Sequence, residues 1–256
     1  IRHRETTQRA RPSGRGELVQ RRKPVNVHRT AGDGRTTEAK QMIELHNVDC
    51  MEYVATLEDN AFELAIVDPP YGIGDFNNSK SKKIHKKIDW NNNIPLKEYF
   101  DELKRVSRNR IIFGVNYYGK HVDDVGRIVH DKTGGNKRKG VASLSDCDIA
   151  SHSFGVNMKI FHYVSIGNVI GNKIDWQNKM RWHPCQKPIA LYEWILMNYA
   201  KEGDRILDTH LGSGSIAIAC HNLGFDLVGC ELDADYFNAA KKRLQQHQSQ
   251  LRIPMT

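Results

Sequence analysis

The 256-residue chain contains no apolar stretch that resembles a secretory signal peptide or that is long enough to span a membrane. Cysteine is scarce, and no two cysteines form a Cys-x-x-Cys pair. An odd number without that spacing argues against a disulfide framework and against a zinc site. We therefore expect reduced thiols, no metal site and a cytoplasmic location. The five cysteines are Cys50, Cys147, Cys185, Cys220 and Cys230.

Acidic residues are few at the N-terminal end. Residues 1–40 hold 11 Lys and Arg against 4 Asp and Glu, so most of the formal charge of +8 lies in this segment. It is rich in Arg, Thr and Gly and has no apolar periodicity, which predicts a basic disordered tail over residues 1–41. Such a tail either binds DNA non-specifically or is a solvated extension, and the sequence leaves both readings open.

Beyond residue 41, strand-like and helix-like segments alternate, which predicts an α/β fold with a mostly parallel sheet and helices on both faces. A hydrophobic content of 39% in 256 residues is enough for one substantial core. The predicted strands are 42–48, 63–67, 110–115, 205–207 and 227–229. The predicted helices are 51–57, 215–223 and one with Pro95 in its first turn that carries Tyr99, Leu103 and Val106. Core stripes at helical spacing are Leu191, Trp194, Ile195 and Tyr199, and Phe237, Ala240 and Leu244.

Two polar stretches interrupt this alternation. Residues 72–93 contain a cluster of lysines, and residues 126–182 combine short β-like runs with Gly- and Asn-rich turns. The second stretch looks like an insertion on the α/β scaffold and not like a separate domain. The basic residues of both stretches either contact DNA phosphates or form solvated loops. These candidate DNA-binding residues are Lys82, Lys83, Lys86, Lys87, Lys137, Arg138 and Lys139.

The most specific motif is Asp68-Pro69-Pro70-Tyr71, which follows the apolar run 64–67. Methyl transfer to an aromatic exocyclic amine needs acceptors for the NH2 hydrogens, because the nitrogen lone pair is otherwise delocalised into the ring. A carboxylate and a fixed backbone carbonyl at a strand end supply such acceptors, and an adjacent aromatic ring can stack on the base. Taken alone, the motif is also compatible with a Pro-rich turn that ends a buried strand.

A second motif, DTHLGSG at residues 208–214, lies between a predicted strand and a predicted helix. Glycines allow close backbone approach, and a helix N-terminus offers free N–H groups to an anionic ligand such as the carboxylate of S-adenosylmethionine. Glu231 ends the next predicted strand about 20 residues later, where an acidic side chain can accept both ribose hydroxyls. Its alternative role is a solvated cap before a helix whose N-cap is Asp233. A dinucleotide is the competing ligand, but the third glycine of its G-x-G-x-x-G fingerprint is missing.

From residue 42 onward, these motifs in this order resemble the circularly permuted β-group of S-adenosylmethionine-dependent DNA amino methyltransferases. ELHNVDCMEYV resembles the opening segment of that family, LAIVDPPYGIG its catalytic motif, and YFDELKRVSRNRIIFGVNYY the helix and strand that follow. HPCQKP at residues 183–188 resembles the family's HPTQKP, and DTHLGSGS with CELD resembles its cofactor site. The resemblance implies a Rossmann-like methyltransferase fold over residues 42–256, with a target-recognition insertion at about 120–181.

The resemblance also assigns residues to the two sites. It places Asp49 near the adenine of S-adenosylmethionine and Lys187 beside its methionine moiety. The cofactor residues implied are Asp49, Cys50, Lys187, Asp208, His210, Leu211, Gly212, Ser213, Gly214, Glu231 and Leu232. The catalytic residues implied are Asp68, Pro69, Pro70 and Tyr71.

Two positions depart from the family pattern. Many relatives have Asp-Pro-Phe before the glycine turn, where this chain has His210, and an imidazole there predicts packing on the cofactor together with added pH dependence. Cys185 replaces a usual threonine. Its Pro-Cys-Gln context resembles the nucleophile motif of cytosine C5-methyltransferases, but those enzymes place the glycine loop first. We therefore interpret Cys185 as structural or adjacent to the cofactor.

The activity implied is direct methyl transfer to the N6 amino group of adenine in double-stranded DNA, with the target base flipped out of the duplex. In this family, Asp at the first motif position goes mostly with N6-adenine and Ser with N4-cytosine. N4-cytosine methylation and a catalytically inactive DNA-binding subunit are the alternatives. The resemblance further implies a monomer or homodimer of bacterial or phage origin, often in a restriction-modification system, with no membrane partner.

Overall fold

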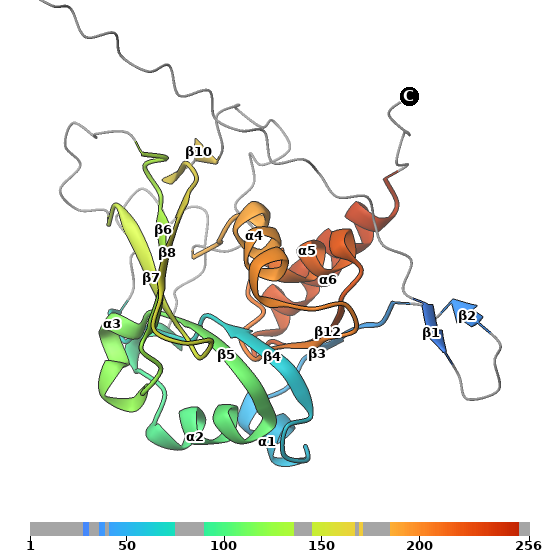
Figure 1. The fold of residues 1–256 in the computed structure, drawn as a ribbon, viewed down its shortest axis with the longest axis horizontal. Coiled ribbons are helices and arrows are strands. Elements are labelled where there is room, and N and C mark those ends of the chain that lie inside the picture. The colour runs from blue at the N-terminus through green and yellow to red at the C-terminus, as the bar shows by residue number, and fades with distance from the viewer. Residues whose placement is uncertain are drawn as a thin grey trace, which may run out of the picture.

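A computed structural model of the chain describes residues 28–30, 36–38, 41–74, 90–135, 145–166, 169–170 and 185–250. Their main body is a twisted sheet that lies between two groups of helices (Figure 1). This arrangement confirms the predicted α/β fold with a mostly parallel sheet.

The central sheet has eight strands in the order β3-β12-β11-β4-β5-β7-β6-β8. The first five of these are parallel to one another. β7 is antiparallel to both β5 and β6, and β8 is parallel to β6. The strands are β3 Ile43–His46, β4 Phe62–Val67, β5 Ser107–Phe113, β6 Gly126–Asp131, β7 Cys147–His152, β8 Met158–His162, β11 Arg205–Asp208 and β12 Asp226–Cys230.

Helices cover both faces of the sheet (Figure 1). On one face lie α1 Cys50–Ala55, α2 Lys97–Val106 and the short α3 Val115–Tyr118. On the other lie α4 Ile189–Tyr199, α5 Ser215–Leu223 and α6 Ala234–Gln248. Short 3-10 turns occur at Trp90–Asn92 and Gly119–His121.

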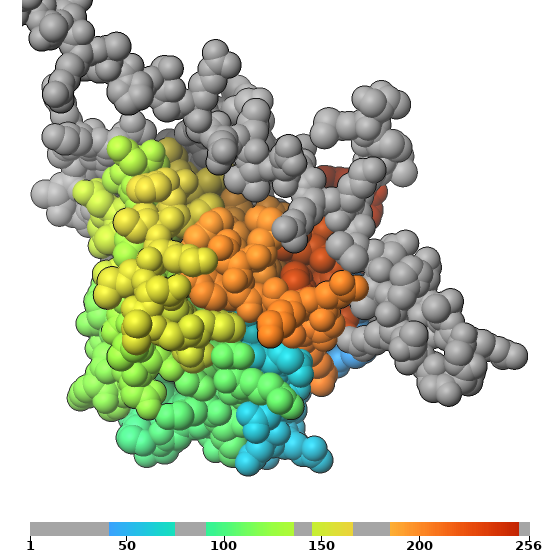
Figure 2. Space-filling view, in the orientation of Figure 1, coloured from blue at the N-terminus to red at the C-terminus, as the bar shows by residue number. Residues whose placement is uncertain are grey.

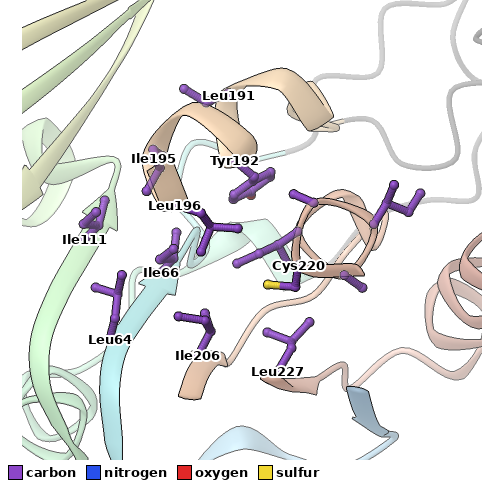
Figure 3. Close-up of a cluster of buried hydrophobic side chains, with 14 of the residues drawn as sticks. Leu64, Ile66, Ile111, Leu191, Tyr192, Ile195, Leu196, Ile206, Cys220 and Leu227 are labelled. Carbon is purple, nitrogen blue, oxygen red and sulfur yellow. The ribbon is translucent and has the colours of Figure 1, made fainter. Parts of the chain in front are cut away.

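The strands at the centre of the sheet are apolar on both sides, as expected of parallel strands that helices cover twice. In β4, Leu64 and Ile66 belong to the cluster under α4 and α5, and Figure 3 shows both side chains pointing toward these helices. Phe62, Ala65 and Val67 belong to the second cluster, which includes α1, α2 and α3 residues. This alternation along one strand follows from the two-residue period of β-structure.

The sequence predicted these elements closely, with two differences. Helix α5 has the predicted bounds, and Ala240 and Leu244 of α6 are buried in the core. The strand predicted at 110–115 begins earlier, at Ser107, and it ends before Gly114, whose φ of 79° turns the chain into α3. Pro95 precedes α2, which begins at Lys97.

Much of the stretch 126–182 continues the main sheet. β6, β7 and β8 all lie within it, and β9 Ser165–Ile166 pairs with β10 Val169–Ile170 in a separate two-stranded sheet. β8 also packs on α4: the rings of Phe161 and Trp194 lie 5.3 Å apart, and the surfaces of the two segments adjoin in Figure 2. The described strands between residues 120 and 181 therefore contribute to the scaffold, and the role of this stretch in target recognition stays a prediction.

The tail predicted to be disordered over residues 1–41 contains two short strands among its described residues. β1 His28–Thr30 pairs antiparallel with β2 Thr36–Glu38. The β-branched threonines at 30, 36 and 37 favour extended backbone, which explains why this part of the tail differs from the expectation.

Within the described ranges, no helix combines the length and apolar character needed to cross a bilayer. The five cysteines all lie in these ranges, and none of them forms a disulfide.

Candidate active site

The candidate functional residues gather where β4 and β11 end. These strands are parallel neighbours, with Ala65 beside Leu207, so Asp68 and Asp208 reach the same edge of the sheet. After β11 the chain enters α5 on one face, whereas after β4 it leads to α2 on the other (Figure 1). An α/β sheet forms a ligand-binding crevice where successive connections leave for opposite faces. The predicted catalytic and cofactor motifs lie at the strand ends where such a crevice is expected.

Asp68 is hydrogen bonded through both carboxylate oxygens. Oδ2 accepts from Lys187 Nζ at 2.5 Å, and Oδ1 accepts from the Tyr71 hydroxyl at 2.5 Å. Lys187 Nζ also donates to the Tyr71 hydroxyl at 3.2 Å. A carboxylate has about four lone-pair sites, so each oxygen of Asp68 keeps capacity for a further donor. The Asp68 side chain is 15% exposed, which leaves it accessible from the crevice.

Lys187 carries its charge into a buried position. Its Nζ lies 4.7 Å from the ring centroid of Phe113, and the side chain is only 6% exposed. Burial by itself lowers the pKa of Lys187, but Asp68 and Asp148 together raise that pKa above its ordinary value. The resemblance assigned Lys187 to the methionine moiety of the cofactor. The structure places its ammonium group directly on the carboxylate of the catalytic motif.

The turn that carries Tyr71 is fixed by two residues that the sequence analysis did not single out. Asn91 accepts from the backbone N–H of Tyr71 at 2.9 Å and donates to the Gly74 carbonyl at 2.8 Å. At Gly114, a Cβ atom would lie 2.2 Å from Cε1 of Tyr71, so only glycine leaves room for the ring there. Gly114 could have been noticed in the sequence, because a glycine near the end of a predicted strand indicates a turn or a close contact. No spacing in the sequence connected Asn91 with the motif at residues 68–71.

The ring of Tyr71 is stacked on another aromatic side chain. Its centroid lies 4.8 Å from that of Tyr117, with an interplanar angle of 15°. Burial and the neighbouring Asp68 raise the pKa of Tyr71 well above its ordinary value, so its hydroxyl remains a donor. The resemblance assigned Tyr71 to stacking on the target base. In the structure, one face of the ring is covered by Tyr117, which the sequence analysis did not single out.

The glycine turn after β11 is held by Glu231. One oxygen of Glu231 accepts from Gly212 N at 2.8 Å, and the other accepts from Asp233 N at 3.0 Å. Asp233 is the N-cap of α6, as predicted. Gly214 has a φ of 71°, and a Cβ atom there would lie 3.0 Å from Cβ of Ala240. Glu231 thus holds the glycine turn and also binds the backbone of Asp233, the N-cap of α6. Its two oxygens retain acceptor sites for hydroxyl donors.

A buried arginine anchors the same turn from α6. Arg243 Nη1 donates to the Ser213 carbonyl at 2.8 Å and to Ser215 Oγ at 2.9 Å. Burial lowers the pKa of Arg243 to about 10, which leaves it charged at neutral pH. The sequence analysis did not single out Arg243. Its position next to Leu244, which belongs to a predicted core stripe, could have indicated a buried charge.

Asp208 is buried and His210 is partly buried, and burial shifts their pKa values in opposite directions. Burial raises the pKa of Asp208 to about 8, and the charges of Asp68 and Glu231 add to that effect. Burial lowers the pKa of His210 to about 4. The pH dependence expected from His210 therefore falls below the neutral range, and its contact with the cofactor stays a prediction. Its Nδ1 lies 2.9 Å from the Thr209 hydroxyl.

The other predicted cofactor residues border the same edge of the sheet. Asp49 caps α1 by accepting from Met51 N at 2.7 Å, and burial raises the pKa of the adjacent Cys50 to about 12. The Leu211 backbone N–H donates to the Cys230 carbonyl at 2.8 Å. Leu232 is 67% exposed, which makes it an apolar surface beside Glu231. Cys185 is partly buried, two positions before Lys187.

This set of groups fits S-adenosylmethionine. The carboxyl groups of Asp49, Asp208 and Glu231 can accept from hydroxyl and ammonium donors, and the exposed Leu232 suits an apolar ring. The bare glycine backbone at 212 and 214 allows a ligand to approach closely. The candidate DNA contacts Lys82, Lys83, Lys86, Lys87, Lys137, Arg138 and Lys139 lie outside the described residues, as does the HisPro pair at 183–184.

Sequence and structure comparisons give related proteins. A family model of N6/N4 methylases, described as DNA methylase, matches residues 166–242. Type II methyltransferase M.HpaI of Haemophilus parainfluenzae is 28% identical over 232 residues, which cover 77% of this chain and 72% of that protein. Type II methyltransferase M2.DpnII of Streptococcus pneumoniae is 40% identical over 70 residues, 27% of this chain and 25% of that protein. The PvuII DNA methyltransferase, described as cytosine-N4-specific, has a similar structure with a TM-score of 0.52 at 10% identity, covering 81% of this chain and 92% of that one. At that identity the similarity concerns the fold.

Proposed function

We infer that the chain is an S-adenosylmethionine-dependent DNA methyltransferase of the N6/N4 family, because its sequence matches are to DNA methylases and its fold is the Rossmann-like fold of this enzyme class. We propose further that its target is the N6 amino group of adenine in double-stranded DNA. The permuted order of its motifs, relative to other methyltransferases, is part of the same proposal.

One relationship carries this proposal: the carboxylate of the catalytic motif and the glycine turn of the cofactor motif lie at the ends of adjacent parallel strands. Asp68 follows β4 and Asp208 ends β11, although 140 positions separate them in the sequence. Methyl transfer requires an activated amine and a methyl donor to meet in one crevice. The order of the strands in the sheet supplies that meeting point.

We propose that the donor is held by Glu231 at its ribose, by the glycine turn 212–214 at its methionine carboxylate, and by Asp49 near its adenine. Cys50, Lys187, Asp208, His210, Leu211, Ser213 and Leu232 would complete that site. When bound, S-adenosylmethionine supplies an electrophilic methyl group on a positively charged sulfur atom. Asp68 would contribute negative charge near the place where that cation is expected, and the buried Asp208 carboxyl would contribute polar contacts.

The chain's own residues would prepare the amine. Asp68 would accept one amine hydrogen on a free lone pair while Lys187 keeps its carboxylate oriented and paired with a positive charge. The Pro69 carbonyl, fixed between two proline rings of the turn, would accept the other hydrogen. Pro70 restricts the backbone of the turn, and Tyr71 would stack on the base. Two acceptors on one amine draw its lone pair out of the ring and toward the donor.

Adenine is favoured because Asp stands at the first position of the motif, where the resemblance associates Ser with N4-cytosine. The family model covers both amines, and PvuII is described as cytosine-N4-specific. The choice of adenine over cytosine as the target base therefore rests on a single residue, Asp68. The DNA contacts at Lys82–Lys87 and 137–139, base flipping, and a monomeric or homodimeric state belong to the same proposal.

The experiment that tests it is transfer of labelled methyl from S-adenosylmethionine to unmethylated DNA, followed by digestion to nucleosides. Asp68→Asn removes the negative charge with little change of shape, and we expect it to abolish label in N6-methyladenine. Asp101→Asn is the matched control, because this carboxylate lies exposed on α2 in a surface pair with Lys97. S-adenosylmethionine binding, measured on each protein, shows that the variants are folded.

Each outcome separates one part of the proposal. Label in N4-methylcytosine would preserve the mechanism and reject adenine as the target. Label that survives in Asp68→Asn would reject the role of Asp68. An absence of label on varied DNA, in a protein that binds S-adenosylmethionine, would favour an inactive DNA-binding subunit of the same fold.

A further inference from the structure

We infer that Tyr117 occupies the position on Tyr71 that the target base would take, and that it is a positioning residue which leaves Tyr71 when a base enters. This inference rests on the proposed function, since it concerns the same base site. It adds a residue outside the catalytic motif, on the short helix α3.

The first support is the geometry of the stack. The Tyr71 and Tyr117 rings are nearly parallel, at 15°, with centroids 4.8 Å apart, which is the arrangement a base would adopt on Tyr71. Other groups lie around the same ring. One edge lies on the backbone of Gly114, Tyr118 is tilted against the ring at 6.4 Å, and the Lys187 ammonium is 5.7 Å from its centroid. A base that stacks on the face now held by Tyr117 has to displace Tyr117.

The second support is the contrast between Tyr117 and its neighbour. Tyr118 is fully buried, and its hydroxyl donates to the Phe113 carbonyl. Tyr117 is 40% exposed, and it stands on a helix of only four residues with glycines at 114 and 119 on its two sides. Tyr118 is thus part of the core, whereas Tyr117 can turn toward solvent at little cost in buried apolar area.

The third support is that the structure already contains both kinds of interaction proposed for the base. Tyr117 supplies a ring on Tyr71, and Lys187 supplies an N–H donor to Asp68. Lys187 is buried and paired, and the carboxylate of Asp68 has further lone pairs for an amine. The stacking position on this face of Tyr71 holds one ring at a time, so Tyr117 and a base compete for it.

The test compares wild type, Tyr117→Ala and Tyr117→Phe as full chains, with saturating S-adenosylmethionine and unmethylated amplified bacterial DNA as the probe. An aromatic stack contributes an amount equivalent to roughly two- to tenfold in an equilibrium constant. We expect Tyr117→Ala to lower the KM for DNA by roughly that factor, with kcat far less affected. Tyr117→Phe keeps the competing ring, so it is expected to restore the wild-type KM.

Three results would overturn the inference. A raised KM in Tyr117→Ala would mean that Tyr117 supports the base instead of competing with it. An unchanged KM in an active Tyr117→Ala enzyme would mean that the stack has no part in base entry. A wild type that binds S-adenosylmethionine but labels no DNA would refute the proposed function and this inference with it, and it is recognised before any variant is compared.

Discussion

The ammonium group of Lys187 lies 2.5 Å from Oδ2 of Asp68, across 119 positions of sequence. This contact joins the segment before α4 to the end of β4. Because both groups are shielded from solvent, their attraction is screened much less than that of a surface pair. The pair therefore fixes the orientation of the carboxylate.

Replacing Lys187 with Met is expected to lower kcat/KM by roughly 10- to 100-fold, because a hydrogen bond to a charged group contributes about 1.5–3 kcal/mol. Loss of the ammonium group also removes the donor that orients the Asp68 carboxylate, so we expect kcat to fall while the KM for DNA changes far less. Steady-state methyl transfer at several DNA concentrations measures both parameters. Lys97→Met is the control, since its exposed pair with Asp101 contributes little. An unchanged kcat in a folded Lys187→Met protein would contradict the role assigned to Lys187.

The sequence was sufficient for most of the fold because its signals are local. An apolar run before Asp68, the glycine turn before Ser215 and the helical spacing of Leu191 and Ile195 each lie within a few residues. They fix the type and approximate bounds of the elements, and each of these elements was predicted correctly. The strand predicted at 110–115 extended past the end of β5 at Phe113, because Val115 is apolar whether it lies in a strand or a helix.

The details of the site depend on contacts between distant segments. Lys187 on Asp68, Arg243 on Ser213 and Tyr117 on Tyr71 arise from side-chain directions that the order of strands and helices determines. Nothing in the spacing of these residues indicates that they meet. A resemblance to a family assigns roles to the residues of its motifs. It did not identify Arg243, which anchors the glycine turn, or Tyr117, which stacks on Tyr71.

Asp208 should make the stability of the cofactor-free protein depend on pH. Its pKa is raised from its ordinary value near 4 to about 8, so the favourable contribution is complete below about pH 4 and is lost as pH rises through about 8. One titrating group contributes at most about 1.4 kcal/mol per pH unit within this window. Asp208→Asn keeps an acceptor for His210 N and does not titrate. We expect its free energy of unfolding in urea to exceed that of wild type increasingly from pH 5 to 8. A parallel pH dependence of the two proteins would contradict this.

Arg243 should matter for cofactor binding although it lies outside the glycine motif. Arg243→Met leaves the buried Ser213 carbonyl without its donor, which costs about 1–3 kcal/mol, and it frees the turn that precedes α5. We expect a lower free energy of unfolding together with roughly tenfold weaker S-adenosylmethionine binding, measured by calorimetry. Lys242→Met, at the exposed neighbouring position, is the matched control. Equal affinity in the two variants would limit Arg243 to a role in stability.

Gly114 and Gly74 together separate the cost of backbone conformation from the cost of crowding. Both have positive φ, 79° and 73°, so alanine at either position pays about 1–2 kcal/mol for left-handed backbone. At Gly74 a Cβ atom meets nothing within 4 Å, whereas at Gly114 it would lie 2.2 Å from Tyr71 and 2.6 Å from the Tyr118 hydroxyl. We therefore expect Gly114→Ala to lower the free energy of unfolding by about 1–3 kcal/mol more than Gly74→Ala, as typical for overpacking.

Because the added methyl group displaces the Tyr71 ring, Gly114→Ala should also reduce methyl transfer at temperatures where it remains folded. Urea unfolding and single-turnover transfer, measured side by side, test both expectations. Equal destabilisation by the two substitutions would show that the Tyr71 ring shifts away freely, and that its position on the backbone of Gly114 is not fixed.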